Sequence, residues 1–389
     1  MDSPFRHELQ VAIRAVQAAT KISRHVLLDA NKGEIQKADL TPVTVADYAI
    51  QAVLTHTLHS AFPEDGLVGE ESAGELLTNP ALVQHMWTVI QHCASSDLDN
   101  KTTNHSANGA SVDPWPPSPS SLASLISLCE TTTPSGADSG RVWVFDPIDG
   151  TKTFLKGQQY AINVALLIGG RQILSVVCCP LLDSAATGPI TNATLDPKGE
   201  DGGCILFAVK GCGAFVRPVH GGFGDVEVKK LERHADGVAV DGLRSVTCWR
   251  DLDSTLEGIN EASTTALGVE YPGCDLVGWV PRWAVLALGL ANMTVWVYKR
   301  GRHGKIWDHA GAMLLFEEVG GMITDVNGRD IDLTQGRKFT SNFGFVAAPR
   351  SVHHLVLQAV RDTLRAHGKG DMLRESGDTS KQQMSGMTC

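Results

Sequence analysis

Two aspartates three positions apart end an apolar run and could act together on one ligand. The segment VFDPIDGTKTF covers residues 144–154, with carboxylates at Asp146 and Asp149. Pro147 cannot extend a strand's hydrogen bonds, so we expect the chain to turn there. Two converging carboxylates need a compensating charge, and oxygen ligands are those that Mg²⁺ prefers. The amides of Gly150 and Thr151 could face an anion if a helix begins there. The pattern therefore indicates a divalent cation shared with a phosphate.

Two other interpretations of this segment remain open at this point. Each aspartate could cap the local backbone in an Asx turn, because aspartate and glycine are common turn residues. A calcium-binding EF-hand loop fits less well, since the Asp-x-Asp-x-Asp-Gly spacing with a later glutamate is absent here and around residues 325–328.

Three further acidic residues favour a metal site over a local turn at Asp146 and Asp149. Glu70 follows the apolar-glycine segment 67–69 within LVGEES, and Asp308 opens a predicted helix within KIWDHAG. Asp47 lies three residues after Thr44, where the two would form a capping box at a helix start. Each alone could be structural, because acidic residues near helix N-termini complement the helix dipole.

Taken together, these motifs resemble a known family. VGEES, DPIDGT and WDHAG, in this order, resemble the lithium-sensitive, magnesium-dependent phosphatases of the inositol monophosphatase superfamily. That superfamily includes inositol monophosphatases, fructose-1,6-bisphosphatases and 3'(2'),5'-bisphosphate nucleotidases. The resemblance covers residues 5–360. The segments TPVTVADYAIQ and DPIDGTKTFLKGQQYAINVALL are most similar to the bisphosphate nucleotidase branch.

The resemblance implies a set of metal ligands. Glu70, Asp146 and Asp149 would bind metal together with the backbone carbonyl of Ile148. Asp308 would hold a second metal from the other half of the chain. Two or three Mg²⁺ ions are expected, and so is inhibition by lithium.

The resemblance also implies catalytic and substrate-binding roles. Asp47 and the Thr151 hydroxyl would orient and deprotonate a water molecule. The amides of Gly150 and Thr151 would hold phosphate oxygens, with Asp308 also next to the substrate. Because phosphoryl transfer depends mainly on positioning and charge compensation, no covalent nucleophile is required.

The segments that would bind the nucleotide depart from the pattern of that branch. Trp279 lies where serine is expected, Arg282 where lysine is, and Trp283 where tyrosine is. Trp296 falls near an expected arginine. These tryptophans could be core residues or could reshape the leaving-group pocket. Arg282 is predicted to contact phosphate, since its planar fork matches phosphate oxygens. A basic cluster lies just before WDHAG, and it could be a solvated loop or a replacement site for a second substrate phosphate. Its members are Lys299, Arg300, Arg302 and His303.

The resemblance implies a hydrolase. The expected reaction is hydrolysis of adenosine 3',5'-bisphosphate to AMP and phosphate, or of a related 3'-phosphorylated metabolite such as PAPS. The alternatives are an inositol or sugar monophosphatase, or a diverged phosphatase acting on a specialised metabolite. A non-catalytic phosphate-binding homologue is a further alternative, because fold does not imply function.

The elements that must position these residues alternate between helices and strands. This order predicts an α/β fold, an α+β layered sandwich of αβαβα type. The expected N-terminal domain is 1–182, with a mobile insertion at 93–140. The expected C-terminal domain is 183–365, followed by a disordered tail at 366–389. Helices are expected at 5–30, 44–60, 122–129, 282–293 and 307–320. Strands are expected at 141–146, within 160–180 around Gly169-Gly170, within 204–218, and in a hairpin around Asn327-Gly328.

Composition limits the classes of partner. The 389 residues carry a formal net charge of −10, which argues against nucleic acid or an anionic membrane surface as the main partner. No apolar run reaches the length of a membrane span, and the N-terminus lacks the pattern of a secretory signal. Nine cysteines without a CxxC pair favour a reducing, cytoplasmic compartment. The expected partner is a small phosphorylated metabolite, and the sequence makes no prediction of oligomeric state.

Overall fold

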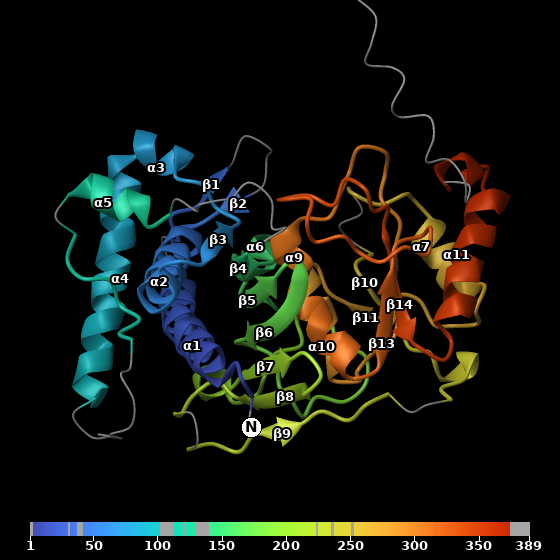
Figure 1. The fold of residues 1–389 in the computed structure, drawn as a ribbon, viewed down its shortest axis with the longest axis horizontal. Helices are drawn as coiled ribbons and strands as arrows, with labels where there is room; N and C mark the ends of the chain where they lie inside the picture. The colour runs from blue at the N-terminus through green and yellow to red at the C-terminus, as the bar shows by residue number, and fades with distance from the viewer. Residues whose placement is uncertain are drawn as a thin grey trace, which may run out of the picture.

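The chain folds into five alternating layers of helix and sheet (Figure 1). This computed structural model describes residues 3–29, 32–36, 42–101, 112–119, 121–129, 140–222, 225–234, 237–249 and 253–373. The order of layers is helices, a large sheet, helices, a small sheet and helices, which confirms the predicted α/β layered sandwich.

The large sheet has seven strands in the order β3-β4-β5-β6-β7-β8-β9. The β3 and β4 strands run parallel, and every later neighbour is antiparallel. The strands are β3 (Gly66–Gly69), β4 (Arg141–Asp149), β5 (Ala161–Ile168), β6 (Arg171–Cys179), β7 (Cys204–Val209), β8 (Gly213–Pro218) and β9 (Lys229–Lys230). Both faces of β4 are buried, which explains its continuous apolar sequence.

Two long helices, α1 (Arg6–Leu28) and α2 (Val45–Ala61), cover one face of this sheet, and α4 (Pro80–Lys101) packs against them on the side away from the sheet (Figure 1). They share a core with Trp143 and Phe145 of β4. The predicted capping box opens α2, because the Asp47 carboxylate accepts the Thr44 N–H at 2.7 Å and the Thr44 hydroxyl accepts the Ala46 N–H at 3.2 Å. The helices predicted at 5–30 and 44–60 are therefore confirmed.

The other face of the sheet packs against a second helical layer. It contains α8 (Trp279–Ala287), α9 (Ile306–His309) and α10 (Ala312–Glu318). Val142 and Val144 of β4 enter this second core, so side chains alternate between the two faces as strand geometry requires. Beyond it lies a small sheet in the order β12-β14-β13. Its strands are β12 (Thr294–Trp296), β14 (Phe345–Pro349) and β13 (Gly321–Thr324), and α7 (Ile259–Thr265) and α11 (His353–Ala366) cover its outer side.

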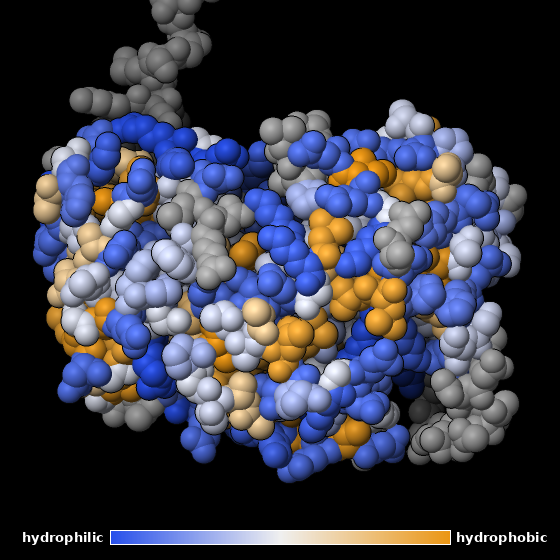
Figure 2. Space-filling view, turned by 180° about the vertical axis from the view of Figure 1, so that it is seen from behind, coloured by the Kyte–Doolittle hydropathy of each residue, from blue (hydrophilic) through white to orange (hydrophobic). Residues whose placement is uncertain are grey.

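The remaining elements are short. They are β1 (Ile35–Gln36), β2 (Pro42–Val43), α3 (Gly74–Thr78), α5 (Leu122–Ser127), α6 (Thr151–Phe154), β10 (Val246–Thr247) and β11 (Cys274–Asp275). None of the described helices is long and apolar enough to cross a lipid bilayer. The face seen in Figure 2 is covered largely by hydrophilic side chains, with smaller apolar patches between them.

Most of the predicted strands are observed. The chain forms β5 and β6 around Gly169-Gly170, and β7 and β8 form the hairpin within 204–218. The hairpin predicted around Asn327-Gly328 is wrong. The turn forms, with the Gly328 N–H donating to the Asp325 carbonyl at 2.9 Å, but β13 pairs with β14 instead of a returning strand.

Two predicted helices also differ in extent. The helix expected at 282–293 is α8, Trp279–Ala287. The helix expected at 307–320 is two helices, α9 and α10, because Gly311 has a φ of 81°. Its N–H donates to Gln172 Oε1 at 2.7 Å rather than to a helical carbonyl.

The predicted domain borders fall inside continuous structure. The large sheet continues past residue 182 into β7, β8 and β9, so no break in the sheet marks that border. The segment expected to be an insertion at 93–140 begins within α4, and α5 confirms the short helix expected at 122–129. Its residues 102–111, 120 and 130–139 lie outside the described residues, as does 374–389 of the predicted tail.

Candidate metal centre

The end of β4 brings the two aspartates of DPIDG together. In a regular strand, residues three apart point to opposite faces. The pairing of β4 with β5 shifts register between Asp146 and Asp149, where Pro147 supplies no N–H to the ladder. One oxygen from each of Asp146, Asp149 and Asp308 lies within 4.8 Å of the others. The predicted convergence of carboxylates from both halves of the chain is therefore observed.

Glu70 reaches the same place from the neighbouring strand. Because β3 and β4 are parallel, their carboxyl ends meet at one edge of the sheet. The side-chain amide of Gln51 in α2 holds this strand end with two hydrogen bonds. Its Nε2 donates to the Glu71 carbonyl at 2.8 Å, and its Oε1 accepts the Glu71 N–H at 2.9 Å. Glu70 itself lies 3.8 Å from the ammonium of Lys305.

Asp308 lies on α9, and a side chain of the large sheet bonds the backbone of this helix. Asn163 of β5 donates to the carbonyls of Trp307 and Ala310 at 2.6 and 2.9 Å. These bonds satisfy carbonyls that a continuous helix would have bonded internally, so the break before α10 fixes the direction of α9.

The three clustered carboxyls resist ionisation where they lie. Burial raises the pKa of Asp146 well above its usual value, and the charges of Glu70, Asp149 and Asp308 raise it further. Burial and Asp149 likewise raise the pKa of Asp308, although Lys305 opposes this. Burial raises the pKa of Asp149 to about 7, even though the Val280 N–H and Arg282 favour its charged form. Such a set of buried oxygen donors fits a bound divalent cation, whose charge would offset the repulsion.

A cavity of about 180 Å³ opens onto these carboxylates. Its walls come from both halves of the chain. They are Pro42, Glu70, Asp146, Ile148, Asp149, Gly150, Thr151, Lys152, Val277, Gly278, Lys305 and Asp308. The volume and lining suit a small polar group rather than a large apolar ligand.

Asp47 lies beside this cavity, within reach of Thr151. The Thr151 hydroxyl donates to Asp47 Oδ1 at 3.5 Å and to the Ile148 carbonyl at 3.2 Å. Gly150 has a φ of 93°, which turns the chain sharply from β4 into α6. The structure thus brings together Asp47, Gly150 and Thr151 next to the clustered carboxylates.

Comparison with known proteins agrees with this geometry. The profile of the inositol monophosphatase family matches residues 120–365. A 3'(2'),5'-bisphosphate nucleotidase of Emericella nidulans is 30% identical over 368 residues, covering 93% of this chain and 99% of that protein. A protein of the same name from Oryza sativa is 31% identical over 370 residues, covering 93% and 96%.

The chain belongs to the inositol monophosphatase family. The inositol monophosphatase of Anabaena sp. superposes with a TM-score of 0.56 at 16% identity, over 94% of this chain and all of that one. The resemblance drawn from VGEES, DPIDGT and WDHAG is therefore confirmed, and so is the fold that it implied. This family is metal-dependent, and the acidic cluster of this member has the donors for a metal.

In this family member, Arg282 lies behind the wall of the cavity. Its side chain is 2% exposed and donates to the carbonyls of Leu276 and Val277 at 2.8 and 2.7 Å. Its guanidinium carbon lies 4.3 Å from the Trp279 ring centre and 4.6 Å from that of Trp296. Arg282 therefore fixes the segment that lines the cavity, and its contact with a substrate phosphate stays a prediction.

The tryptophans of the departing segments are core residues. Trp279, Trp283 and Trp296 are buried, and they pack with Phe345 and the neutral ring of His309. Burial lowers the pKa of His309 well below its usual value. Of the basic cluster at 299–303, Arg300 pairs with Asp371, and none of its members lines the cavity.

Sequence reasoning missed the residues that hold the ligands in place. Lys305 precedes WDHAG and could have been found as a cation next to an expected ligand. No nearby residue pattern indicates the roles of Asn163, Gln51 and Gly278. The first two hydrogen-bond segments distant in sequence, and Gly278 leaves room for the Asp149 carboxylate.

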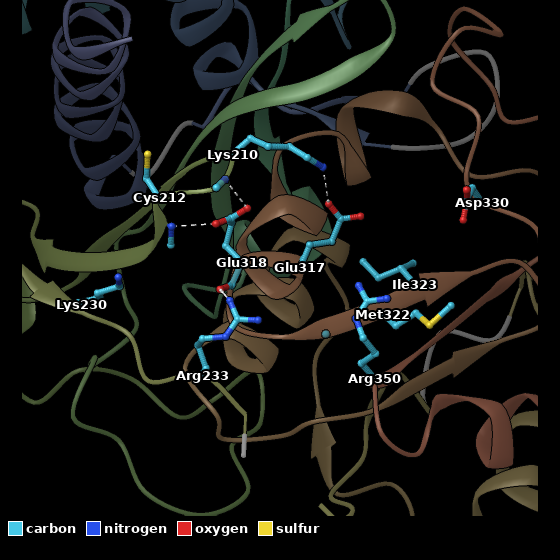
Figure 3. Close-up of a pocket in the computed structure, with 13 residues that line it drawn as sticks. Lys210, Cys212, Lys230, Arg233, Glu317, Glu318, Met322, Ile323, Asp330 and Arg350 are labelled. Atoms are coloured by element: carbon cyan, nitrogen blue, oxygen red, sulfur yellow. Dashed lines mark hydrogen bonds and ion pairs between the residues drawn. The ribbon is translucent and has the colours of Figure 1, made fainter. Parts of the chain in front are cut away.

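A larger cavity of about 460 Å³ lies elsewhere, at the end of α10 (Figure 3). Two of its carboxylates are engaged with neighbouring donors: Glu318 accepts the N–H groups of Gly211 and Gly213, both at 2.8 Å, and Glu317 lies 3.8 Å from Lys210. Among the residues that the structure describes, the only group of acidic, histidine or cysteine side chains spaced for a metal is the one at Asp146, Asp149 and Asp308. The smaller cavity is thus the candidate active site.

Metal-free protein should lose stability as pH rises through the range in which Asp149 ionises. The folded pKa of about 7 exceeds the ordinary value of 3.8, so the folded state binds more protons between these values. The contribution of the protonated Asp149 carboxyl to the stability of the folded state is thus greatest below about pH 4 and is lost by about pH 7. Urea denaturation in EDTA should show this fall in wild type relative to Asp149→Asn. A wild-type stability that rises relative to the variant over the same range would contradict it.

Replacing Gly278 by alanine should displace Asp149. A Cβ at residue 278 would lie 2.6 Å from Asp149 Oδ2 and 2.9 Å from Pro281 Cδ. Because misplacement of a reacting group by about 1 Å can cost roughly a hundredfold in rate, we expect a 10- to 100-fold loss of kcat/KM. Gly140→Ala is the matched control, since nothing lies within 4 Å of its added Cβ. Equal kcat/KM values for the two variants would contradict this role.

Proposed function

We propose that this chain is a Mg²⁺-dependent phosphomonoesterase that hydrolyses adenosine 3',5'-bisphosphate to AMP and phosphate, or acts on a related 3'-phosphorylated nucleotide such as PAPS. The observation that carries the chemistry is the convergence of three carboxylates, from β4 and α9, on one small cavity. The nucleotide is supported by the nucleotidase relatives that match nearly the whole chain.

Asp146, Asp149, Asp308 and Glu70 would hold the cations, together with the carbonyl of Ile148. We propose two or three Mg²⁺ ions, because four carboxylates exceed the charge of a single divalent cation. When bound, these cations supply Lewis-acid activation of water and charge compensation for the phosphate.

The residues beside the cluster would handle the proton and the phosphate. Asp47 accepts the proton of the attacking water through the Thr151 hydroxyl, which it contacts at 3.5 Å. As the water oxygen bonds to phosphorus, the bond from phosphorus to the 3'-oxygen breaks, and that oxygen takes up a proton from solvent, to which Asp47 later releases the proton it accepted. The amides of Gly150 and Thr151 bind the phosphate oxygens, and Asp308 lies against the same group.

The proposed compartment is the cytoplasm.

The substrate is tested by comparing turnover of adenosine 3',5'-bisphosphate and inositol 1-phosphate, each with Mg²⁺ and with EDTA. We expect Mg²⁺-dependent release of phosphate, with kcat/KM at least about tenfold higher for the nucleotide. Faster hydrolysis of inositol 1-phosphate would assign the chain to the other substrate class. No release from either, by folded protein that binds Mg²⁺, would contradict the enzyme assignment.

A further inference from the structure

Arg337 joins two segments that lie far apart in sequence and both carry predicted metal ligands. Its Nη1 donates to the Gly69 carbonyl at 2.9 Å and its Nη2 to the Glu70 carbonyl at 2.7 Å. Its guanidinium carbon also lies 4.3 Å from the centre of the Trp307 ring, directly before Asp308. One side chain therefore contacts the Glu70 backbone and the α9 helix at once.

The backbone of the same segment is paired to the start of α9. The Ile306 N–H donates to the Arg337 carbonyl at 3.1 Å, and the Phe339 N–H donates to the Gly304 carbonyl at 3.0 Å. Lys305 and Lys338 form an antiparallel bridge between these bonds. Residues 337–339 and 304–306 are thus bonded to each other through their backbones, and the guanidinium bonds the first of these segments to the end of β3.

We propose that Arg337 is a positioning residue that sets the separation of the Glu70 and Asp308 carboxylates, and through it the affinity of the site for Mg²⁺. This inference rests on the proposed function of the site. Arg337 is not among the residues that line the cavity, so it acts through Glu70 and Trp307 rather than by touching substrate.

Arginine suits this position better than any other cation. Its planar fork donates two parallel hydrogen bonds to successive carbonyls and stacks on an aromatic face at the same time. A lysine has a single ammonium and cannot reproduce both contacts.

The test is calorimetric titration of Mg²⁺ into Arg337→Met, Arg337→Lys and wild type, without substrate. Loss of residues that orient metal ligands typically costs about 10- to 100-fold in metal affinity, and we expect about tenfold weaker binding by Arg337→Met. Arg337→Lys should fall between this variant and wild type. Arg361→Met is the matched control, since Arg361 is also half-buried and donates to a distant carbonyl, that of Val326 at 3.1 Å.

The result that overturns the inference is wild-type Mg²⁺ affinity in Arg337→Met, or an equal loss of affinity in Arg361→Met. If Arg337→Met does not fold, Arg337→Lys decides, and unchanged affinity in that variant counts against the inference. Wild-type protein that binds Mg²⁺ but releases no phosphate would refute the proposed function while leaving the role of Arg337 intact. The two failures are therefore distinguishable.

Discussion

Asp149→Asn should abolish Mg²⁺-dependent phosphate release, with a loss in kcat/KM on the order of a thousandfold or more. The change keeps the shape of the side chain, and an amide oxygen can still accept the Val280 N–H that Asp149 Oδ2 accepts at 2.6 Å. It removes one negative charge from the centre of the carboxylate cluster. The loss should therefore come from weaker metal binding and not from misfolding.

The control for this variant is Asp196→Asn. Asp196 is also buried, at 8% exposure, and accepts the N–H groups of Lys198 and Gly203, but it lies outside the cluster. This control should keep nearly full activity. Near-wild-type turnover by Asp149→Asn, measured by phosphate release at saturating Mg²⁺, would refute the assignment of the site.

Asp47→Asn should lower kcat by roughly 100- to 10,000-fold, the range expected for loss of a general base, with little change in Mg²⁺ affinity. Asp47 contacts the Thr151 hydroxyl, whereas the close group of carboxylates consists of Asp146, Asp149 and Asp308. The measurement is a steady-state titration with adenosine 3',5'-bisphosphate at several Mg²⁺ concentrations.

Asp47 also belongs to the capping box of α2, so its two roles must be separated. Thr44→Ala removes the hydroxyl that accepts the Ala46 N–H and should cost about 0.5–2 kcal/mol of stability. The same hydroxyl also donates to Asp47 Oδ2 at 2.7 Å, but the Thr44 N–H still holds that oxygen and the Asp47–Thr151 contact remains. We therefore expect kcat to fall far less than in Asp47→Asn. A comparable fall of kcat in both variants would mean that Asp47 acts through the helix cap alone.

The motifs that carry the resemblance, and with it the expected clustering of carboxylates, lie at strand ends and helix starts. Asp146 and Asp149 follow an apolar run that ends at a proline, and Asp47 follows its capping threonine. Each of these signals lies within a few residues of the side chain it positions. The turn at Gly169-Gly170 was predictable for the same reason.

The features that could not be predicted depend on contacts between distant segments. The helix expected at 307–320 breaks at Gly311, whose positive φ is accompanied by bonds from Asn163 and Gln172 of the large sheet to the backbone at Ala310 and Gly311. β13 pairs with β14 rather than with the segment that follows its own turn.

The same limit applies to the substrate segments. Trp279 and Trp296 enclose Arg282, so a residue expected to reach the substrate is buried in the core behind the cavity. The position of Arg282 in the sequence cannot show whether its side chain faces the core or a ligand, because the same residue spacing along α8 is compatible with both.

The metal centre is tested most directly by the structure of a crystal grown with Mn²⁺ and AMP, with the ions located by anomalous scattering. We expect anomalous peaks within about 2.5 Å of oxygens from Asp146, Asp149 and Asp308, with at least one peak also near Glu70. Asp149→Asn crystals should lose or weaken these peaks. Well-ordered crystals with no peak at this cluster, or with Mn²⁺ bound only elsewhere, would contradict the central claim that these carboxylates form the metal centre.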